Sequence, residues 1–93
     1  MIIVSLEYTA SLEEIDMRLA AHRAWLQAAV TSGRLMVAGR RVPRTGGMLI
    51  ARGTMEEIMG WAATDPFADV ARYSFIEIDP TIVAPGLEAL AAS

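Results

Sequence analysis

The stretch IIVSLEYTASLEE, residues 2–14, decides the fold because it combines a strand, a short turn and the start of a helix. In residues 2–9, apolar and polar side chains alternate, which predicts a strand with one apolar face. The sequence SLEE at 11–14 then matches a capping box, with Ser11 as the N-cap and Glu14 reaching back to it. Residues 2–14 therefore predict a strand that leads directly into a helix.

The rest of the chain continues the alternation of strands and helices. The first helix is expected to extend to about Ser32, because Gly33 is suited to the position after a helix end. A second capping box, at residues 54–57, begins a shorter helix. The remaining expected elements are strands at 34–42, 48–52 and 71–79, a turn at 43–47 that includes Gly46 and Gly47, and the second helix through about Ala63.

The order strand, helix, strand, strand, helix, strand predicts an α+β fold of the ferredoxin-like, split βαβ type. Two helices would cover one face of a four-stranded antiparallel sheet. A chain of 93 residues fits one domain, residues 1–93. The tail at 80–93 has two interpretations: a short helix after Pro85-Gly86, or an arm on a partner subunit.

The apolar content, 54% of residues, is high for so small a chain. A domain of this size buries only about two thirds of its unfolded surface. We therefore expect an apolar face that a second copy covers, giving a homodimer whose two sheets meet as an α+β barrel.

Successive side chains of a strand point to opposite faces of the sheet, so odd and even positions decide which residues lie on the face that the helices leave uncovered. In the last strand, Ile76 and Ile78 are expected to face the helices. The acidic residues expected on the open face, Glu7 and Glu77, have two interpretations. They could form a carboxylate pair, or they could pair with arginines across a dimer. The residues expected on that face are Ile3, Ser5, Glu7, Tyr73, Phe75 and Glu77.

Composition excludes several functional classes. The net charge is −3 and no basic run is present, which argues against nucleic acid binding. No apolar stretch approaches the roughly 18 residues of a membrane span, and the N-terminus does not resemble a signal peptide. The chain has no cysteine, which fits a cytoplasmic protein, and one histidine without cysteine disfavours a metal site.

His22 is the only histidine, and it lies on the shoulder of the first helix's apolar stripe. Histidine is the usual side chain for proton transfer near neutral pH, and a carboxylate commonly orients it. Asp65, before Pro66 at the end of the second helix, is a candidate because the two helices lie side by side in this topology. The alternatives are a packed or solvated histidine and a turn aspartate.

The chain resembles the YciI family, also called YCII-related domains, in an ordered set of residues. These are His22, Trp25 and Leu26, Gly33-Arg34-Leu35, Gly39, Asp65-Pro66-Phe67 and Tyr73. The resemblance implies a dimeric α+β barrel with a His–Asp active site, here His22 and Asp65. It also implies a small-molecule enzyme without a cofactor, since one related activity is dehydrochlorination of chlorinated hydroxyquinones. Many members have Gly-Pro where this chain has Gly39-Arg40.

Glu7 and Glu77 of the open face are candidates for substrate binding, and four further residues are as well. Arg40 could pair with an anionic ligand, or it could be solvated beside the hairpin. Trp25, Tyr73 and Phe75 could stack on an aromatic ligand, although Trp25 also fits a core or interface position. The expected function is a lyase, isomerase or hydrolase that uses the His–Asp pair. The alternatives are a non-catalytic binding barrel and a cofactorless monooxygenase or cyclase.

Overall fold

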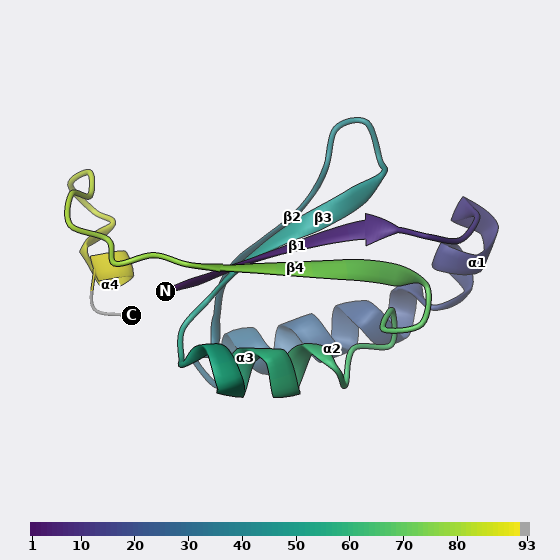
Figure 1. Cartoon of the computed structure of the whole chain (residues 1–93), viewed down its shortest axis with the longest axis horizontal. Helices are drawn as coiled ribbons and strands as arrows, with labels where there is room; N and C mark the ends of the chain where they lie inside the picture. Colours follow the sequence, from purple (N-terminus) through teal and green to yellow (C-terminus); the bar gives the residue numbers. More distant parts are fainter. Residues whose placement is uncertain (92–93) are drawn as a thin grey trace.

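The computed structural model, which describes residues 1–91, has a four-stranded antiparallel sheet in the order β2-β3-β1-β4. Helices α2 and α3 lie against one face of it (Figure 1). This is the expected α+β, ferredoxin-like arrangement. The elements are β1 (Ile2–Tyr8), α1 (Leu12–Met17), α2 (Leu19–Thr31), β2 (Leu35–Arg40), β3 (Gly46–Ala51), α3 (Met55–Ala62), β4 (Ala71–Glu77) and α4 (Glu88–Ala91).

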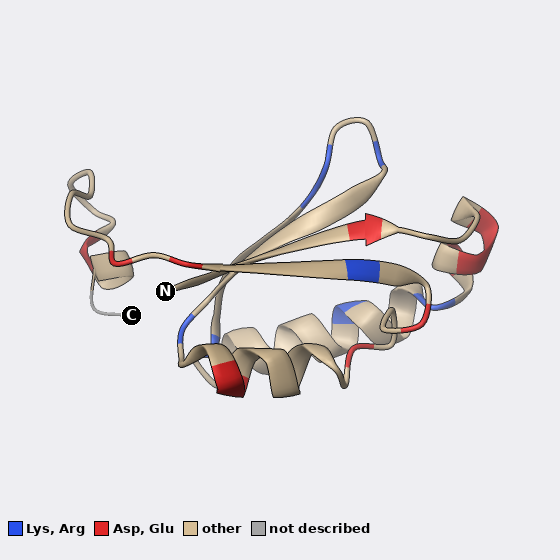
Figure 2. Cartoon of the chain, in the orientation of Figure 1, with Lys and Arg blue, Asp and Glu red and all other residues tan. Residues whose placement is uncertain are grey.

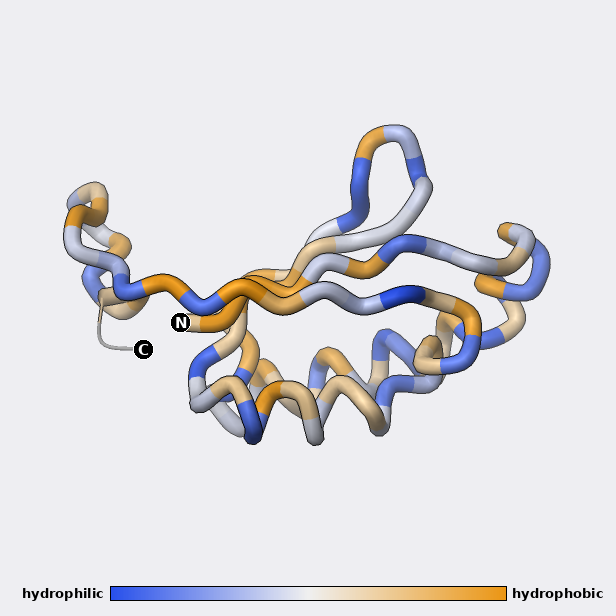
Figure 3. Tube along the Cα trace, in the orientation of Figure 1, coloured by the Kyte–Doolittle hydropathy of each residue, from blue (hydrophilic) through white to orange (hydrophobic). Residues whose placement is uncertain are grey.

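The core lies between the sheet and the two long helices. Ile2, Val4 and Leu6 of β1 are buried and face the helices, as their alternation predicts. Ile15 of α1 and Ile58 of α3 are fully buried against them. Figure 3 shows the apolar, orange segments of the strands gathered toward the end of the sheet where the N-terminus lies. Each such side chain stabilises the fold by about 1.5–3 kcal/mol through burial.

The predicted helix over residues 12–32 is two helices, with a break at Arg18. Ser11 caps α1 as expected, since its hydroxyl accepts from Glu14 N at 3.2 Å, but within residues 1–91 the return bond from the Glu14 side chain is not formed and the complete capping box is the one at Thr54 and Glu57. Arg18, with φ −107° and ψ 0°, is the C-cap of α1 and the N-cap of α2, which begins with Leu19. The side chain of Arg18 contacts Asp69, in the turn before β4. The break therefore coincides with a tertiary contact that no local sequence signal contains.

Gly46 and Gly47 belong to β3, which begins earlier than the expected strand at 48–52. Both pair with β1 and are therefore not turn residues. A Cβ on Gly46 would lie 1.8 Å from the carbonyl oxygen of Leu6. Glycine at 46 thus permits a close approach of β3 to β1, which explains why a turn-forming residue occurs inside a strand.

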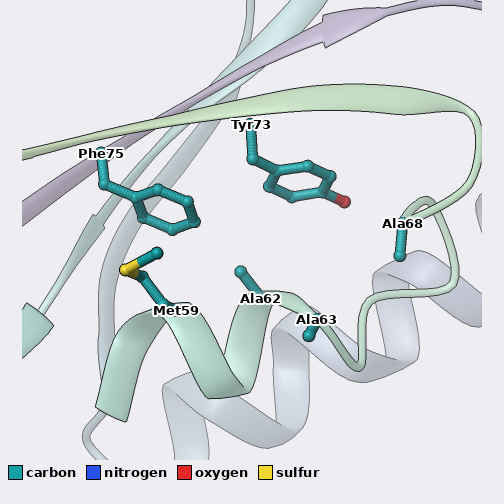
Figure 4. A pocket seen from close by; sticks show the side chains of 6 residues that line it. All are labelled: Met59, Ala62, Ala63, Ala68, Tyr73 and Phe75. Carbon is teal, nitrogen blue, oxygen red and sulfur yellow. The ribbon is translucent and has the colours of Figure 1, made fainter. Parts of the chain in front are cut away.

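The expected orientation of β4 is wrong. The register pairs Tyr73 with Leu6 and Phe75 with Val4, and directly opposed residues of an antiparallel pair share a face. Tyr73 and Phe75 therefore face the helices, as Figure 4 shows. Ile76 is 60% exposed on the open face instead.

The same register separates the two acidic candidates. Glu77 is opposite Ile2, on the helix-covered side, whereas Glu7 is opposite Arg72 on the open side. The Glu7 carboxylate lies 4.0 Å from the Arg72 guanidinium. The expected carboxylate pair of Glu7 and Glu77 is therefore not formed.

The tail contains a short helix, α4, which is one of its two expected interpretations. Arg52 donates a hydrogen bond to Ala89 O at 3.3 Å, which connects α4 to the end of β3. Within residues 1–91, no helix has the length and apolar character to cross a membrane.

Candidate functional site

His22 and Asp65 meet beneath the sheet, although they are far apart in the sequence. His22 is on α2, and Asp65 is in the turn after α3. The Nδ1 atom of His22 lies 2.7 Å from Oδ1 of Asp65. His22 is 8% exposed and Asp65 only 3%. The packing of α2 beside α3 therefore produces the contact that the topology predicts.

Three hydrogen bonds fix the Asp65 carboxylate. Oδ1 accepts from the backbone N–H of Phe67 at 2.9 Å, and Oδ2 accepts from the Tyr73 hydroxyl at 2.6 Å. The third donor is His22 Nδ1. An ionised carboxylate can only accept hydrogen bonds, so the proton in this contact is on Nδ1 of His22. In a neutral His22 ring, the other nitrogen, Nε2, then has a free lone pair. Asp65 is thus both a turn aspartate and the partner of His22.

Tyr73 is a neutral donor at ordinary pH. Burial, followed by its hydrogen bond to Asp65 and the charge of that carboxylate, raises the pKa of the Tyr73 phenol well above its usual value. A tyrosinate beside an ionised Asp65 would place two anions in one partly buried site. The Tyr73 hydroxyl therefore holds Oδ2 of Asp65 in a constant orientation.

Aromatic rings fix the plane of the His22 imidazole. Phe67 stacks on it with ring centroids 3.8 Å apart and an angle of 7° between the planes. Trp25 lies on α2 with its ring centroid 5.9 Å from that of His22. Trp25 stacks in turn on Trp61 at 4.2 Å, and its Nε1 donates to Thr64 Oγ1 at 3.0 Å. Trp25 therefore packs between His22 and the α3 region, and in this position it supports the site.

A cavity of about 190 Å³ borders His22 on the helix-covered side of β2. Its apolar walls come from leucines of α2 and β3 and from Phe67, and its charged residues are Arg23 of α2 and Arg40 of β2. The lining residues are Tyr8, Leu19, His22, Arg23, Leu26, Ala38, Gly39, Arg40, Leu49 and Phe67.

A second cavity, of about 330 Å³, lies between β4 and α3 (Figure 4). Tyr73 and Phe75 point into it from the strand, above Met59 and Ala62 of the helix. Because Tyr73 donates to Oδ2 and His22 to Oδ1, the Asp65 carboxylate bridges residues that line the two cavities.

The structure thus divides the sequence candidates. Arg40 lines the His22 cavity, Tyr73 and Phe75 line the second one, and Glu7 and Glu77 line neither. Sequence reasoning missed Arg23 and Tyr8, and it assigned no role in the site to Phe67. Arg23 directly follows His22, but adjacency in the sequence does not indicate that both side chains line one cavity.

Metal binding has no support in residues 1–91, where no three His, Cys, Asp or Glu side chains are grouped to hold an ion. The ionisable side chains that line the His22 cavity are His22, Tyr8 and two arginines. These residues can exchange a proton or bind an anion, whereas cations prefer carboxylates or several imidazoles.

Comparison with known proteins identifies the family. The profile of the YCII-related domain matches residues 1–81. The chain belongs to the family of YCII-related domains. This YCII-related domain is similar in fold to 5-chloro-2-hydroxyhydroquinone dehydrochlorinase from Burkholderia phenoliruptrix, whose structure contains 2,5-dihydroxybenzoquinone. The two have 20% sequence identity and a TM-score of 0.70, over 84% of this chain and 93% of the other. No curated protein sequence matches the chain.

Proposed function

We propose that this YCII-related domain is a cofactor-independent enzyme for acid–base chemistry on a small molecule, with His22 as the base. The contact that carries the proposal is the 2.7 Å hydrogen bond from His22 Nδ1 to Asp65 Oδ1. It leaves the Nε2 lone pair for a substrate, since no described residue forms a hydrogen bond with Nε2. Asp65 orients the ring and stabilises the imidazolium that forms.

Elimination is the reaction class that we propose, because the similar structure is that of a dehydrochlorinase. His22 would take a proton from the substrate. The electron pair of the broken bond would become a new double bond, and chloride would leave with its own bonding pair. The proton on His22 would then pass to solvent. Such a step changes no overall oxidation state and needs no oxidant or reductant.

The test compares His22→Gln with the unaltered protein, using chloride release from 5-chloro-2-hydroxyhydroquinone. We expect kcat/KM to fall about 10²- to 10⁴-fold, the usual contribution of a positioned acid or base. Gln27→Ala, an exposed change on the same helix, is the matched control and should have no effect. An unchanged kcat/KM in folded His22→Gln would refute the catalytic role. Binding of the probe without chloride release by the unaltered protein would favour a non-catalytic binding protein.

We further propose a homodimer in which the open sheet faces of two copies meet. Four apolar side chains, Val37, Met48, Ile76 and Ile78, are between 37% and 60% exposed. Alternation and register place them on the sheet face opposite α2 and α3. Covering such a face with its own copy is the common solution for small domains. A cytoplasmic location, which the lack of cysteine favours, stays a prediction.

A further inference from the structure

The cavity beside His22 has a positive rim, although the protein as a whole has a net charge of −3. Arg23 and Arg40 approach it from a helix and from the edge strand, and no aspartate or glutamate lines it. Figure 2 shows the same asymmetry, since α2 and the β2–β3 loop contain blue segments and no red ones. The cavity is therefore a cationic site in an acidic protein.

Within residues 1–91, Arg23 and Arg40 form no ion pair, and neither do Arg34, Arg41 and Arg52, whereas Arg18, Arg44 and Arg72 each pair with a carboxylate. The sequence of α2, LAAHRAWLQAAVT, contains no acidic residue that could neutralise Arg23. Arg23 and Arg40 are both exposed, and they are the arginines that line this cavity, whose lining contains no carboxylate. Their charge therefore favours an anion that comes from outside the chain.

Asp16 is an acidic residue close enough for the charge of Arg40 to lower its pKa. Arg44 donates to the Asp16 carboxylate at 2.5 Å and holds its pKa below the ordinary value, and the charge of Arg40 adds to this effect. Because Arg44 already occupies Asp16, Arg40 keeps its hydrogen-bond donors for another partner.

The shape of the cavity limits the size of that partner. Its volume of about 190 Å³ is below the roughly 300–1,000 Å³ of sites for drug-sized ligands. Leu19, Leu26 and Leu49 provide apolar surface, and Phe67, which stacks on His22, provides an aromatic ring. A single ring fits these walls, and an oxyanion on the ring fits the arginines.

We propose that the His22 cavity selects a monocyclic planar oxyanion, with Arg23 and Arg40 binding the charged group and the leucines covering the ring. Guanidinium groups bind carboxylate and phenolate oxygens through paired, charge-assisted hydrogen bonds. This assignment deepens the proposed function by naming the substrate class, and its catalytic consequence rests on that function. Binding itself requires no turnover, so it is measurable separately.

The experiment is an NMR titration of the full chain with benzoate, with benzamide as a neutral match and with 4-nitrophenolate at pH 8.5. We expect benzoate to shift the amides of Gly39 and Arg40 and to bind at least tenfold more tightly than benzamide. The phenolate arm shows whether carboxylate or phenolate is the better oxyanion. Arg23→Gln and Arg40→Gln should each weaken benzoate binding about tenfold and leave benzamide unchanged.

Arg72→Gln is the matched control, since it removes the same charge from the opposite sheet face. Three results would overturn the proposal. They are equal affinity for benzoate and benzamide, no binding of either anion, and a loss of benzoate affinity in Arg72→Gln as large as in the Arg23 and Arg40 variants. If the preference for anions fails while His22→Gln still abolishes chloride release, only the substrate class is wrong. If the preference holds while His22→Gln retains full turnover, only the catalytic role is wrong.

Discussion

At the scale of single residues, Tyr73 is the side chain whose contribution is easiest to isolate. Its hydroxyl donates to Oδ2 of Asp65 at 2.6 Å, and Asp65 is almost fully buried. Tyr73→Phe keeps the ring and removes one of the three donors to that carboxylate. We expect the free energy of unfolding at pH 7 to fall by about 1.5–3 kcal/mol, the usual value for a hydrogen bond to a charged group. Urea denaturation measures this change, and Ser74→Ala, exposed on the opposite face of β4, is the control.

Tyr73 also predicts how stability depends on alkaline pH. Burial and Asp65 raise the pKa of the folded phenol above the value of about 10 in the unfolded chain. Above pH 10 the unfolded state therefore loses this proton first, and the free energy of unfolding decreases as pH rises. Below pH 10 the Tyr73 phenol makes its full contribution to the free energy of unfolding. Denaturation at pH 7, 9, 10 and 11 should show a decline that Tyr73→Phe reduces, and an identical decline in both proteins would contradict the assignment.

The sequence predicted the proximity of His22 and Asp65 but not the third member, Tyr73, as a donor to the carboxylate. Asp65-Pro66 marks a turn by composition, and the topology brings the end of α3 to α2. The face of Tyr73 depends instead on strand parity. Both parities of residues 71–79 contain large apolar side chains, so the pattern alone does not fix which set faces the helices.

At the scale of elements, Gly46 decides how closely β3 approaches β1. An added Cβ would lie 1.8 Å from Leu6 O, which is backbone and cannot rotate away. We expect Gly46→Ala to destabilise the fold by at least about 1–3 kcal/mol, the usual cost of overpacking. Gly60→Ala is the matched control, because Gly60 lies inside α3 with no atom within 4 Å of its new Cβ. That change should stabilise the helix by about 0.5–1 kcal/mol, and thermal unfolding compares the two.

The types of the elements and the starts of two helices were predictable here, whereas the break between α1 and α2 and the start of β3 were not. Capping residues Ser11 and Thr54 begin α1 and α3 where expected, because their side chains accept hydrogen bonds from local backbone N–H groups. The break at Arg18 and the early start of β3 at Gly46 depend on contacts with distant segments. Local patterns contain no information on such contacts.

At the scale of the whole molecule, the corrected orientation of β4 changes what the open sheet face can do. With Tyr73 and Phe75 turned toward α3, that face presents Ile76 and Ile78 instead. The face is therefore more aliphatic than the sequence predicted, and the two cavities described above are on the helix side. This division agrees with the proposed dimer on the open face and the proposed ligand site on the helix-covered face.

The proposed homodimer provides the last prediction, because its proposed interface and the His22 cavity are on opposite sides of the sheet. Two chains of 10.0 kDa give a mass of about 20 kDa. Ile76→Glu would place a charge in the buried centre of the interface, where an unpaired ion is strongly unfavourable. We expect sedimentation at micromolar concentration to give the dimer for the unaltered protein and the monomer for Ile76→Glu. Met17→Glu, a charge at a 77% exposed position at the end of α1, should remain a dimer. A monomer for the unaltered protein would refute the interface, and retained benzoate binding by monomeric Ile76→Glu would show that the cavity belongs to one chain.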